Sequence, residues 1–195
     1  TINNYCIQKC AGFCREAHAA DTFLNCRNSD LYPPEIVVGI RMPGAPPSCL
    51  RMKIGGRYMI IKNMSKEIFN GVRCVLVAFA GTKCVFVRLI SGPATGTTTI
   101  IPSCVFIIAP DQSGLPFNIR RRQFPMIIAY AVTVHKAQGQ TLAKVGLFVT
   151  TDIFTHGQLY TALSRTRGWC NIVVFSTLLT PRILANCVCQ HVLRA

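Results

Sequence analysis

Acidic residues are scarce in this chain of 195 residues: seven aspartates and glutamates stand against 21 lysines and arginines, so the formal net charge is +14. No pair of carboxylates follows an apolar strand, where it would be able to hold Mg²⁺, and Asp111 and Asp152 stand alone. The basic excess favours a polyanionic partner such as nucleic acid, because each phosphate that is neutralised releases condensed counterions. A basic domain without such a partner is the alternative.

Long hydrophobic runs are also missing. No apolar run reaches the roughly 18 residues that a membrane-spanning helix needs, so we expect no membrane partner. The sequence begins at Thr1 without a secretory leader, and we therefore expect that an upstream part precedes it. Half of the residues are hydrophobic, and 195 residues suffice for one domain with a small insertion.

Cysteines are plentiful, but their spacing is not that of a zinc site. Among the 11 cysteines, Cys6, Cys10 and Cys14 repeat every four residues, which predicts one face of a helix. Structural zinc usually takes two matched short Cys pairs, and Cys187 and Cys189 are too close together to be the second. We expect reduced, mostly buried thiols and no metal. We assign no metal role to the scattered histidines His18, His156 and His191.

The first third of the chain reads as a helix, a loop, a short strand and a break. Apolar residues at three- and four-residue spacing predict a helix from Thr1 to about Cys26. A polar loop from Asn25 to Pro34 and a β-branched run from Ile36 to Ile40 follow. The proline-rich segment Met42–Pro47 marks a domain boundary.

The middle third, Leu50 to Pro110, changes to short β-branched runs separated by turn residues such as Asn70-Gly71 and Gly81-Thr82. Several strands in succession without a helix between them predict a small antiparallel β-barrel of the SH3-like kind. The expected strands are Arg57–Ile61, Val72–Ala78, Cys84–Ile90 and Thr98–Ile108.

Beyond Pro116, strands alternate with helices, which predicts a parallel sheet and an α/β fold into which the barrel is inserted. We expect Thr155 to cap the second helix, and Thr180-Pro181 to open a third. The expected order is strand Ile127–Val132, helix His135–Leu142, strand Val145–Val149, helix His156–Arg165 and strand Cys170–Ser176.

One stretch concentrates polar groups where a buried strand ends. In Ala129–Leu142, an apolar run turns into a polar segment in which Gly139 permits close backbone approach and Thr133, His135 and Gln138 offer hydrogen-bonding groups. Open α/β sheets place ligands at such strand ends. An ordinary polar turn is the alternative.

Arginines supply the second candidate site. Ser164-Arg165-x-Arg167 ends a predicted helix, where a guanidinium can bind phosphate oxygens bidentately or simply complement the helix dipole. The run Arg120–Arg122 either binds nucleic acid or is solvated, and the flanking Phe117 and Phe124 are expected in the core. Three further basic residues extend this surface as candidates: Lys53, Arg57 and Lys62.

These segments resemble one family closely. Arg122-Gln-Phe-Pro125, the stretch Ala-Tyr-Ala-Val-Thr-Val-His-Lys-Ala-Gln-Gly-Gln-Thr that ends at Thr141, and His156-Gly-Gln-Leu-Tyr-Thr-Ala-Leu-Ser-Arg165 look like the C-terminal part of Pif-type DNA helicases. These are RecD-related superfamily 1B enzymes, and Helitron helicases are very similar. The segments beginning at Leu50 and Lys62 resemble the start of the family's 2B insertion, and Ile2-Asn-Asn4 resembles the segment before it.

The resemblance implies a second RecA-like domain, of P-loop NTPase fold, split by a barrel: residues 1–40 and 113–195 form the domain and 41–112 the 2B insertion. Thr133–Thr141 matches helicase motif V and Gln158–Arg167 matches motif VI, so that Arg165 falls at the arginine finger, the catalytic residue. The implied nucleotide-binding residues are Gln138, Gly139, Gln158 and Arg165. The implied DNA-binding residues are Thr133, His135, Lys136, Gly139, Thr141, Arg121 and Arg122.

One departure from the family decides what we expect the chain to do alone. The phosphate-binding loop G-x-x-x-x-G-K-[ST] is nowhere in the 195 residues. ATP and Mg²⁺ are therefore expected to bind mainly to a first RecA-like domain outside this sequence, and the isolated chain is expected to lack ATPase activity.

We expect a monomeric 5′-to-3′ helicase acting on single-stranded or forked DNA, in the nucleus or alternatively the mitochondrion. A degenerate mobile-element remnant that only binds nucleic acid is the competing hypothesis.

Overall fold

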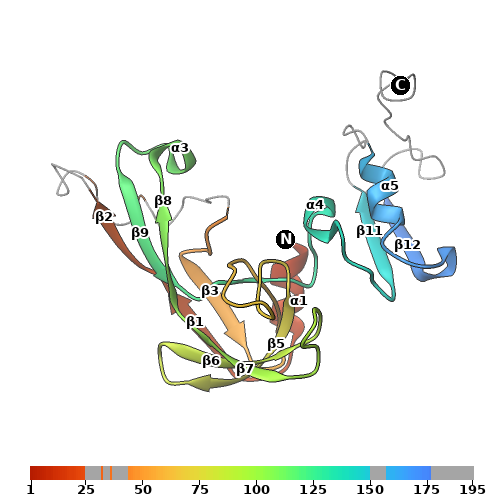
Figure 1. Ribbon diagram of the computed structural model, residues 1–195, viewed down its shortest axis with the longest axis horizontal. Helices are drawn as coiled ribbons and strands as arrows, with labels where there is room; N and C mark the ends of the chain where they lie inside the picture. The colour runs from red at the N-terminus through yellow and green to blue at the C-terminus, as the bar shows by residue number, and fades with distance from the viewer. Residues whose placement is uncertain (25–31, 33–35, 37–43, 150–156, 177–195) are drawn as a thin grey trace. The chain divides into compact units, whose positions relative to one another are not determined.

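The computed structural model describes residues 1–24, 32, 36, 44–149 and 157–176. The chain divides into two compact units, unit 1 (Thr1–Ala131) and unit 2 (Val132–Ala195), and each is described by itself (Figure 1). Among the described residues, no helix has the length and apolar character to cross a membrane.

Unit 1 is built almost entirely of antiparallel strands. Its largest sheet has five strands in the order β10-β4-β5-β6-β7, and two smaller sheets have the orders β1-β3 and β2-β9-β8. The elements are α1 (Ile2–Lys9), β1 (Cys14–His18), β2 (Ala20–Leu24), β3 (Cys49–Lys53), β4 (Arg57–Ile60), β5 (Arg73–Ala80), β6 (Cys84–Leu89), β7 (Thr98–Pro102), β8 (Cys104–Ile108), α3 (Pro110–Ser113), β9 (Asn118–Gln123) and β10 (Met126–Ile128).

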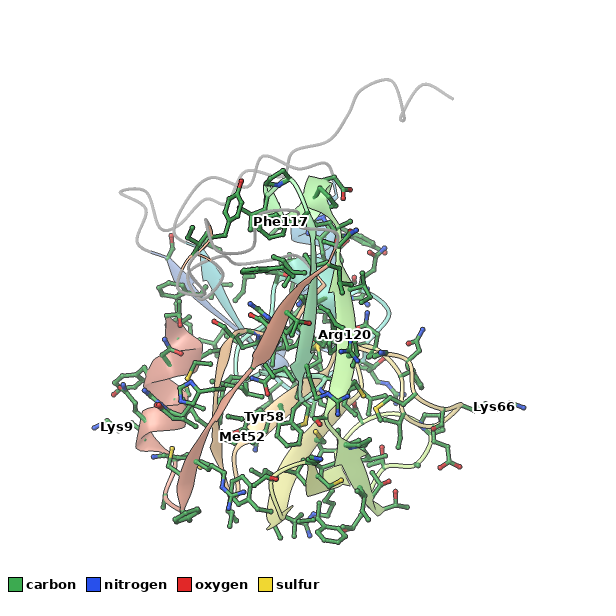
Figure 2. The ribbon with its side chains drawn as sticks, turned by 90° about the vertical axis from the view of Figure 1, so that its left-hand side faces the viewer. Lys9, Met52, Tyr58, Lys66, Phe117 and Arg120 are labelled. Atoms are coloured by element: carbon green, nitrogen blue, oxygen red, sulfur yellow. The ribbon has the colours of Figure 1, made fainter. Side chains whose placement is uncertain are left out.

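Alternating apolar residues on these strands build a small cluster of Ile108, Phe117 and Ile119 and a larger main core. Buried positions on β5 and β6 recur at every second residue, as expected for strands with one face turned inward. Met52 and Tyr58 lie inside this core, whereas Lys9 and Lys66 extend outward (Figure 2). The Tyr58 hydroxyl accepts from the Lys53 amide at 2.7 Å and donates to the Arg51 carbonyl at 3.2 Å, so the buried phenol fastens β4 to β3.

The prediction of a helix from Thr1 to Cys26 is wrong beyond Lys9. Lys53 from β3 ends α1 by donating its ammonium group to the carbonyls of Gln8 and Cys10, at 3.1 and 2.9 Å. Residues 14–18 then pair with β3 instead of continuing the helix. The three cysteines of the expected helical face are therefore divided between α1, its C-cap and β1.

Most strands predicted for the middle of the chain are confirmed, namely β4, β5 and β6. The run 98–108 instead forms two strands, because the pairing of β7 with β6 ends at the Ser103 amide, which donates to the Lys83 carbonyl, and from Cys104 onward β8 pairs with β9 in another sheet. The five-stranded sheet has β10 and β7 as its edges, and the described residues include no closed barrel. Barrel closure and the boundaries at 40/41 and 112/113 stay predictions.

Unit 2 contains the predicted parallel pair. Strands β11 (Val145–Val149) and β12 (Ile172–Ser176) run parallel, and α5 (Gln158–Leu163) lies between them in the sequence. Leu159 and Ala162 of α5 pack with Leu147 and Val149 of β11, as in a βαβ unit. The short 3₁₀ helix η2 (Trp169–Asn171) leads into β12.

Two elements at the start of this region are shorter than predicted. The strand expected to reach Val132 ends with β10 at Ile128, and the helix expected over 135–142 is the single turn α4 (Val134–Ala137). The second difference arises because α4 ends at its C-cap Gln138, whose ψ of 136° is not helical, and Gly139 follows in the left-handed region with φ of +75°. The predicted N-cap Thr155, the helix from Thr180 and most of the run Ile36–Ile40 lie outside the described residues.

Candidate functional site

The polar turn that the sequence singles out is an exposed feature of unit 2. The Thr133 carbonyl accepts from the amides of Lys136 and Ala137, at 3.0 and 3.2 Å, and so starts the single turn of α4. Ala137 is buried and anchors this turn. The candidate contact residues lie at the surface: Thr133, His135, Lys136, Gln138, Gly139 and Thr141.

Gly139 lets the chain reverse while leaving its surface open. A side chain added at this glycine would meet no atom within 4 Å, so the glycine is required by its backbone angle and not by crowding. The turn is closed from within, since the Gln140 side-chain amide donates to the Lys136 carbonyl at 2.9 Å. The polar groups therefore occur on an ordered turn with free space above Gly139.

Arg165 connects this turn to the segment after α5. The Leu142 amide donates to the Arg165 carbonyl at 2.8 Å, and the Arg165 Nη1 donates to the Gln140 carbonyl at 3.3 Å. Its Nε and Nη2 donate to the Thr161 carbonyl and the Ser164 hydroxyl, at 2.7 and 2.9 Å. The two stretches that the sequence analysis selected separately thus meet at one arginine.

The acceptors around Arg165 are all neutral. The ion pairs among the described residues are Arg51–Glu16 and Arg121–Asp21, so Arg165 holds its charge against carbonyl and hydroxyl oxygens only. A guanidinium that is half-buried and not neutralised can exchange these partners for phosphate oxygens, which form the stronger, charge-assisted hydrogen bonds.

The other nucleotide-site candidates lie at different distances from Arg165. Gln138 and Gly139 directly precede its partner Gln140. Gln158 is half-buried at the first position of α5, seven residues before Arg165, or about 10 Å along a helix axis. Arg167 is exposed two residues beyond Arg165. The structure therefore brings the turn close to Arg165, but leaves Gln158 at the far end of α5.

The three arginines of the run 120–122 point to alternate faces of β9, a consequence of strand geometry that the sequence analysis did not consider. Arg120 and Arg122 are exposed on β9, whereas Arg121 points inward and is 1% exposed. Its guanidinium donates to both carboxylate oxygens of Asp21, at 2.7 to 3.2 Å, and to the Pro46 carbonyl at 3.0 Å. Burial leaves Arg121 no surface for DNA in this structure, and its role is better explained as structural. The predicted DNA contact of Arg122 stays a prediction.

Arg122 has basic neighbours that the sequence analysis missed. It lines a cavity of about 300 Å³ in unit 1 together with Arg15, Lys83 and His18. Arg15 is oriented by stacking over the Phe79 ring at 4.4 Å and by donating to the Gly81 carbonyl at 2.7 Å. Arg15 and Arg122 are 107 positions apart along the chain, and only strand pairing brings them together. The expectation that Phe117 and Phe124 are core residues is confirmed.

Unit 2 has a second surface feature that sequence reasoning missed. The only tryptophan, Trp169, is 77% exposed and Tyr160 is 72% exposed. Together with Arg167 they line an apolar cavity of about 270 Å³. Exposed aromatic side chains beside an arginine are a signal that a search for charged motifs does not detect.

Comparison with known proteins shows which families this chain is similar to. Residues 128–173, which include both α4 and Arg165, match the family model of the UvrD-like helicase C-terminal domain. The chain is 31% identical over 136 residues to the ATP-dependent DNA helicase Pif1 of Campylobacter jejuni, covering 66% of this chain and 30% of that protein. It is 34% identical over 123 residues to the human ATP-dependent DNA helicase PIF1, covering 61% of this chain and 18% of that protein.

The fold of nearly the whole chain is also similar to that of a solved Pif1 helicase. The crystal structure of the Pif1 helicase from Bacteroides in complex with ADP-AlF3 and single-stranded DNA matches with a TM-score of 0.63 and 24% identity, covering 95% of this chain and 39% of that one. This neighbour implies the RecA-like fold of a helicase C-terminal domain. The chain spans less than a third of the length of these two sequence relatives. It is a homologue of the Pif1-type helicases and contains a UvrD-like helicase C-terminal domain.

Proposed function

We propose that this chain is the second motor domain, with its 2B insertion, of a 5′-to-3′ ATP-dependent DNA helicase. The observation that supports this most strongly is the junction at Arg165, where the turn 133–142 and the segment after α5 are joined by two hydrogen bonds. The junction lies within the residues that match a helicase C-terminal domain. In this proposal strands β4 to β7 of the five-stranded sheet belong to an SH3-like barrel over residues 41–112, and β10 pairs with β4 from outside that range.

The junction offers a direct way to couple nucleotide and DNA. When Arg165 turns toward a γ-phosphate, its Nη1 leaves the Gln140 carbonyl, and the turn loses one of the bonds that hold it. The exposed groups of that turn, including His135 and Lys136, are the ones proposed to grip a DNA strand. Hydrolysis and release of phosphate return Arg165 to Gln140 and restore the turn. A change of hydrogen-bond partner at one arginine thus alters the DNA grip.

The exposed groups of the turn also indicate which ligands the chain would bind. A single strand offers phosphates to Lys136 and bases to the His135 ring, which suits a sequence-independent grip. In unit 1, Arg122, Arg15 and Lys83 offer a second place for phosphate. The Bacteroides relative was crystallised with ADP-AlF3 and single-stranded DNA, which supports ATP and single-stranded DNA as ligands here. We propose forked DNA as a further substrate. We propose that Mg²⁺ and most ATP contacts come from a first RecA-like domain, that the enzyme is monomeric, and that it acts in the nucleus.

Hydrolysis by the full-length protein tests the role of Arg165. Arg165→Ala and Arg165→Lys are expected to lower the ATPase rate by about 10³ to 10⁵-fold, because neither provides the planar fork of an arginine finger. Arg167→Ala, two residues away and exposed, is the matched control and should retain activity. If the Arg165→Lys enzyme hydrolysed ATP at the wild-type rate, the finger assignment would be wrong.

DNA binding by the 195-residue chain tests the turn separately. Fluorescence anisotropy with a labelled single strand should show binding that weakens steeply with salt, and His135→Ala with Lys136→Ala should reduce it at least tenfold. Lys66→Ala removes an exposed lysine that extends from a loop of unit 1 and is the control (Figure 2). Equal affinity of the double variant and the control would remove the turn from the DNA site.

A nucleic-acid-binding module without motor activity is the second candidate. The observation behind it is the basic excess of these 195 residues, a formal net charge of +14, which suits DNA binding whether or not a motor is attached. The transcript upstream of Thr1 separates the two: an in-frame phosphate-binding loop supports the motor, and a stop codon leaves only the binding module.

A further inference from the structure

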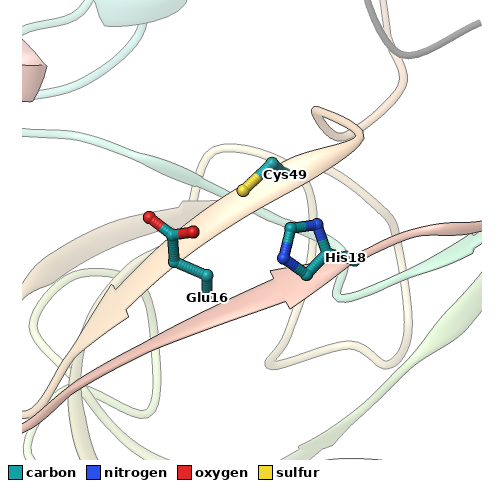
Figure 3. Close-up of side chains that lie close together, drawn as sticks. All are labelled: Glu16, His18 and Cys49. Carbon is teal, nitrogen blue, oxygen red and sulfur yellow. The ribbon is translucent and has the colours of Figure 1, made fainter. Parts of the chain in front are cut away.

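Three possible metal ligands lie together on one face of the β1–β3 ladder in unit 1. Glu16 and His18 alternate along β1 and therefore share a face, and Cys49 on β3 is the direct cross-strand partner of His18. One ligand atom from each residue lies within 4.8 Å of the other two. Figure 3 shows the carboxylate, imidazole and thiol side by side above the two strands, and all three residues are exposed.

We propose that Glu16, His18 and Cys49 form a binding site for Zn²⁺. One sulfur, one nitrogen and one oxygen ligand suit Zn²⁺, whereas Mg²⁺ and Ca²⁺ take oxygen ligands almost exclusively. Three protein ligands leave a fourth tetrahedral position for water. Glu16 and His18 also line the cavity of about 300 Å³ in unit 1, which gives that water room.

The ligand separations are close to what a tetrahedral ion requires. Zinc–ligand bonds of about 2.0 to 2.3 Å place the ligand atoms about 3.3 to 3.8 Å apart. The present limit of 4.8 Å therefore has to shorten by about 1 Å. Exposed side chains can do this by rotation about their χ angles, because the paired strands already hold the three backbones in register.

Arg51 competes with the ion for the Glu16 carboxylate. It is the cross-strand partner of Glu16, and its Nη2 lies 3.2 Å from the Glu16 Oε1. The two side chains are 38% and 46% exposed, so this ion pair is weak and can be displaced. Zinc takes the thiolate of Cys49, whose proton is released to solvent as the metal–sulfur bond forms. A thiolate and a carboxylate together neutralise the two charges of the ion.

The site can be tested apart from Arg165 and its turn, although Glu16 and His18 line the same cavity as Arg122, the predicted DNA contact. It lies on unit 1, whereas Arg165 and its turn lie on unit 2. A bound ion would join β1 to β3 by side chains in addition to their backbone ladder, and so stabilise the strand pair that holds residues 14–18 against residues 49–53. Neither DNA nor ATP is needed to observe it.

Co²⁺ is a suitable probe because its bond to a thiolate absorbs in the near ultraviolet. Titration of the reduced 195-residue chain should give a charge-transfer band, and Zn²⁺ should abolish it. Cys49→Ser and His18→Ala should each weaken this binding by about 100-fold or more, because loss of a group that only supports a ligand already costs about 10 to 100-fold. Arg51→Gln should strengthen it, since it frees Glu16.

Cys14→Ser is the matched control. Cys14 is an exposed cysteine of the same β1–β3 ladder, but it lies on β1 and pairs with Lys53 at the other end. It should bind Co²⁺ as the wild type does. The proposal is overturned if Cys49→Ser keeps the wild-type affinity and number of sites, or if Cys14→Ser loses as much as Cys49→Ser.

A measurement on the unaltered chain avoids any doubt about folding of the variants. Zn²⁺ should slow alkylation of Cys49 by iodoacetamide at least tenfold while leaving Cys14 unchanged, as read by mass spectrometry of the labelled peptides. Equal alkylation of Cys49 with and without Zn²⁺ would overturn the proposal, whatever the outcome of the DNA and ATPase experiments.

Discussion

The main core of unit 1 is more deeply buried than the core of unit 2, although both units leave some large apolar side chains exposed. The main core of unit 1 consists of side chains that are 0 to 4% exposed, and the core of unit 2 of four residues that are 5 to 9% exposed. Around the smaller core, Tyr160, Trp169 and Phe175 are more than half exposed. Large apolar groups at the surface often mark a region where a protein meets a partner. The core of unit 1 is therefore the better enclosed of the two, and the exposed aromatic side chains of unit 2 are candidates for contacts.

One arginine of each unit shows how differently a buried charge can be compensated. Arg121 in unit 1 is buried and neutralised by Asp21, so its charge serves the fold. Arg165 in unit 2 is half-buried and bonded to neutral oxygens, so its charge remains available to a phosphate. The sequence presents both as arginines in basic, polar surroundings. Burial and partners separate the structural one from the candidate for catalysis.

The largest effect on this contrast is expected from Asp21→Ala. Removing the carboxylate takes the Asp21 partner away from a guanidinium that is 1% exposed, which should lower the free energy of unfolding of unit 1 by about 3 to 5 kcal/mol. Urea unfolding followed by hydrogen exchange of unit 1 peptides measures this. Glu16→Ala, with a chelator present, is the control, since the exposed Arg51 pair should contribute at most about 1 kcal/mol. Similar losses in the two variants would contradict the structural role of Arg121.

Gly56→Ala should have the next largest effect. A Cβ at this position would lie 2.8 Å from the Lys53 carbonyl oxygen and 2.9 Å from both the Ile7 Cδ1 and the Tyr58 hydroxyl. Crowding of this kind in a closed core costs about 1 to 3 kcal/mol, and thermal unfolding should show it. Gly146→Ala in unit 2 is the control, because its Cβ would meet only Phe175, at 3.5 Å. A variant at Gly56 as stable as wild type would show that unit 1 is less tightly packed than described.

Alkaline pH should destabilise unit 1 through Cys74. Burial raises the pKa of this thiol from 9.0 to about 12, so above pH 9 the unfolded state releases a proton that the folded state keeps. Stability from this group is complete below pH 9 and is lost toward pH 12, by up to about 1.4 kcal/mol per pH unit. Unfolding measured from pH 8 to 11 should show a shallower decline in Cys74→Val. An unchanged slope in that variant would assign the decline to other groups.

The smallest effect is expected at the exposed aromatic surface of unit 2. Trp169→Ser should change the free energy of unfolding by no more than about 0.5 kcal/mol, because the side chain is 77% exposed. Circular dichroism during thermal unfolding measures this. Leu147→Ala, which removes a core residue of the same unit, should cost more. A large loss in Trp169→Ser would mean that this surface supports the fold and is not reserved for contacts.

Local periodicity in the sequence determined the parts of the fold that depend on near neighbours. Alternation in the middle of the chain located β4, β5 and β6, and the strand-helix-strand order located the parallel pair β11 and β12. The polar composition of the turn 133–142 was sufficient to select it as a site, because its groups are adjacent in the chain and Gly139 reverses the backbone there. These features require no knowledge of distant residues.

The tertiary structure alone decided what depends on pairing across long separations. Asp21 and Arg121 are 100 residues apart, and only the pairing of β2 with β9 reveals that the middle arginine of the run is buried. Lys53 lies more than 40 residues from the end of α1 in the sequence, yet it binds the carbonyls there. The periodicity of a helix cannot predict such a contact. The cluster of Glu16, His18 and Cys49 escaped a search for spaced cysteine pairs for the same reason. Side chains from separate strands become neighbours only when the backbone ladder sets their register, and that register is a property of the folded chain.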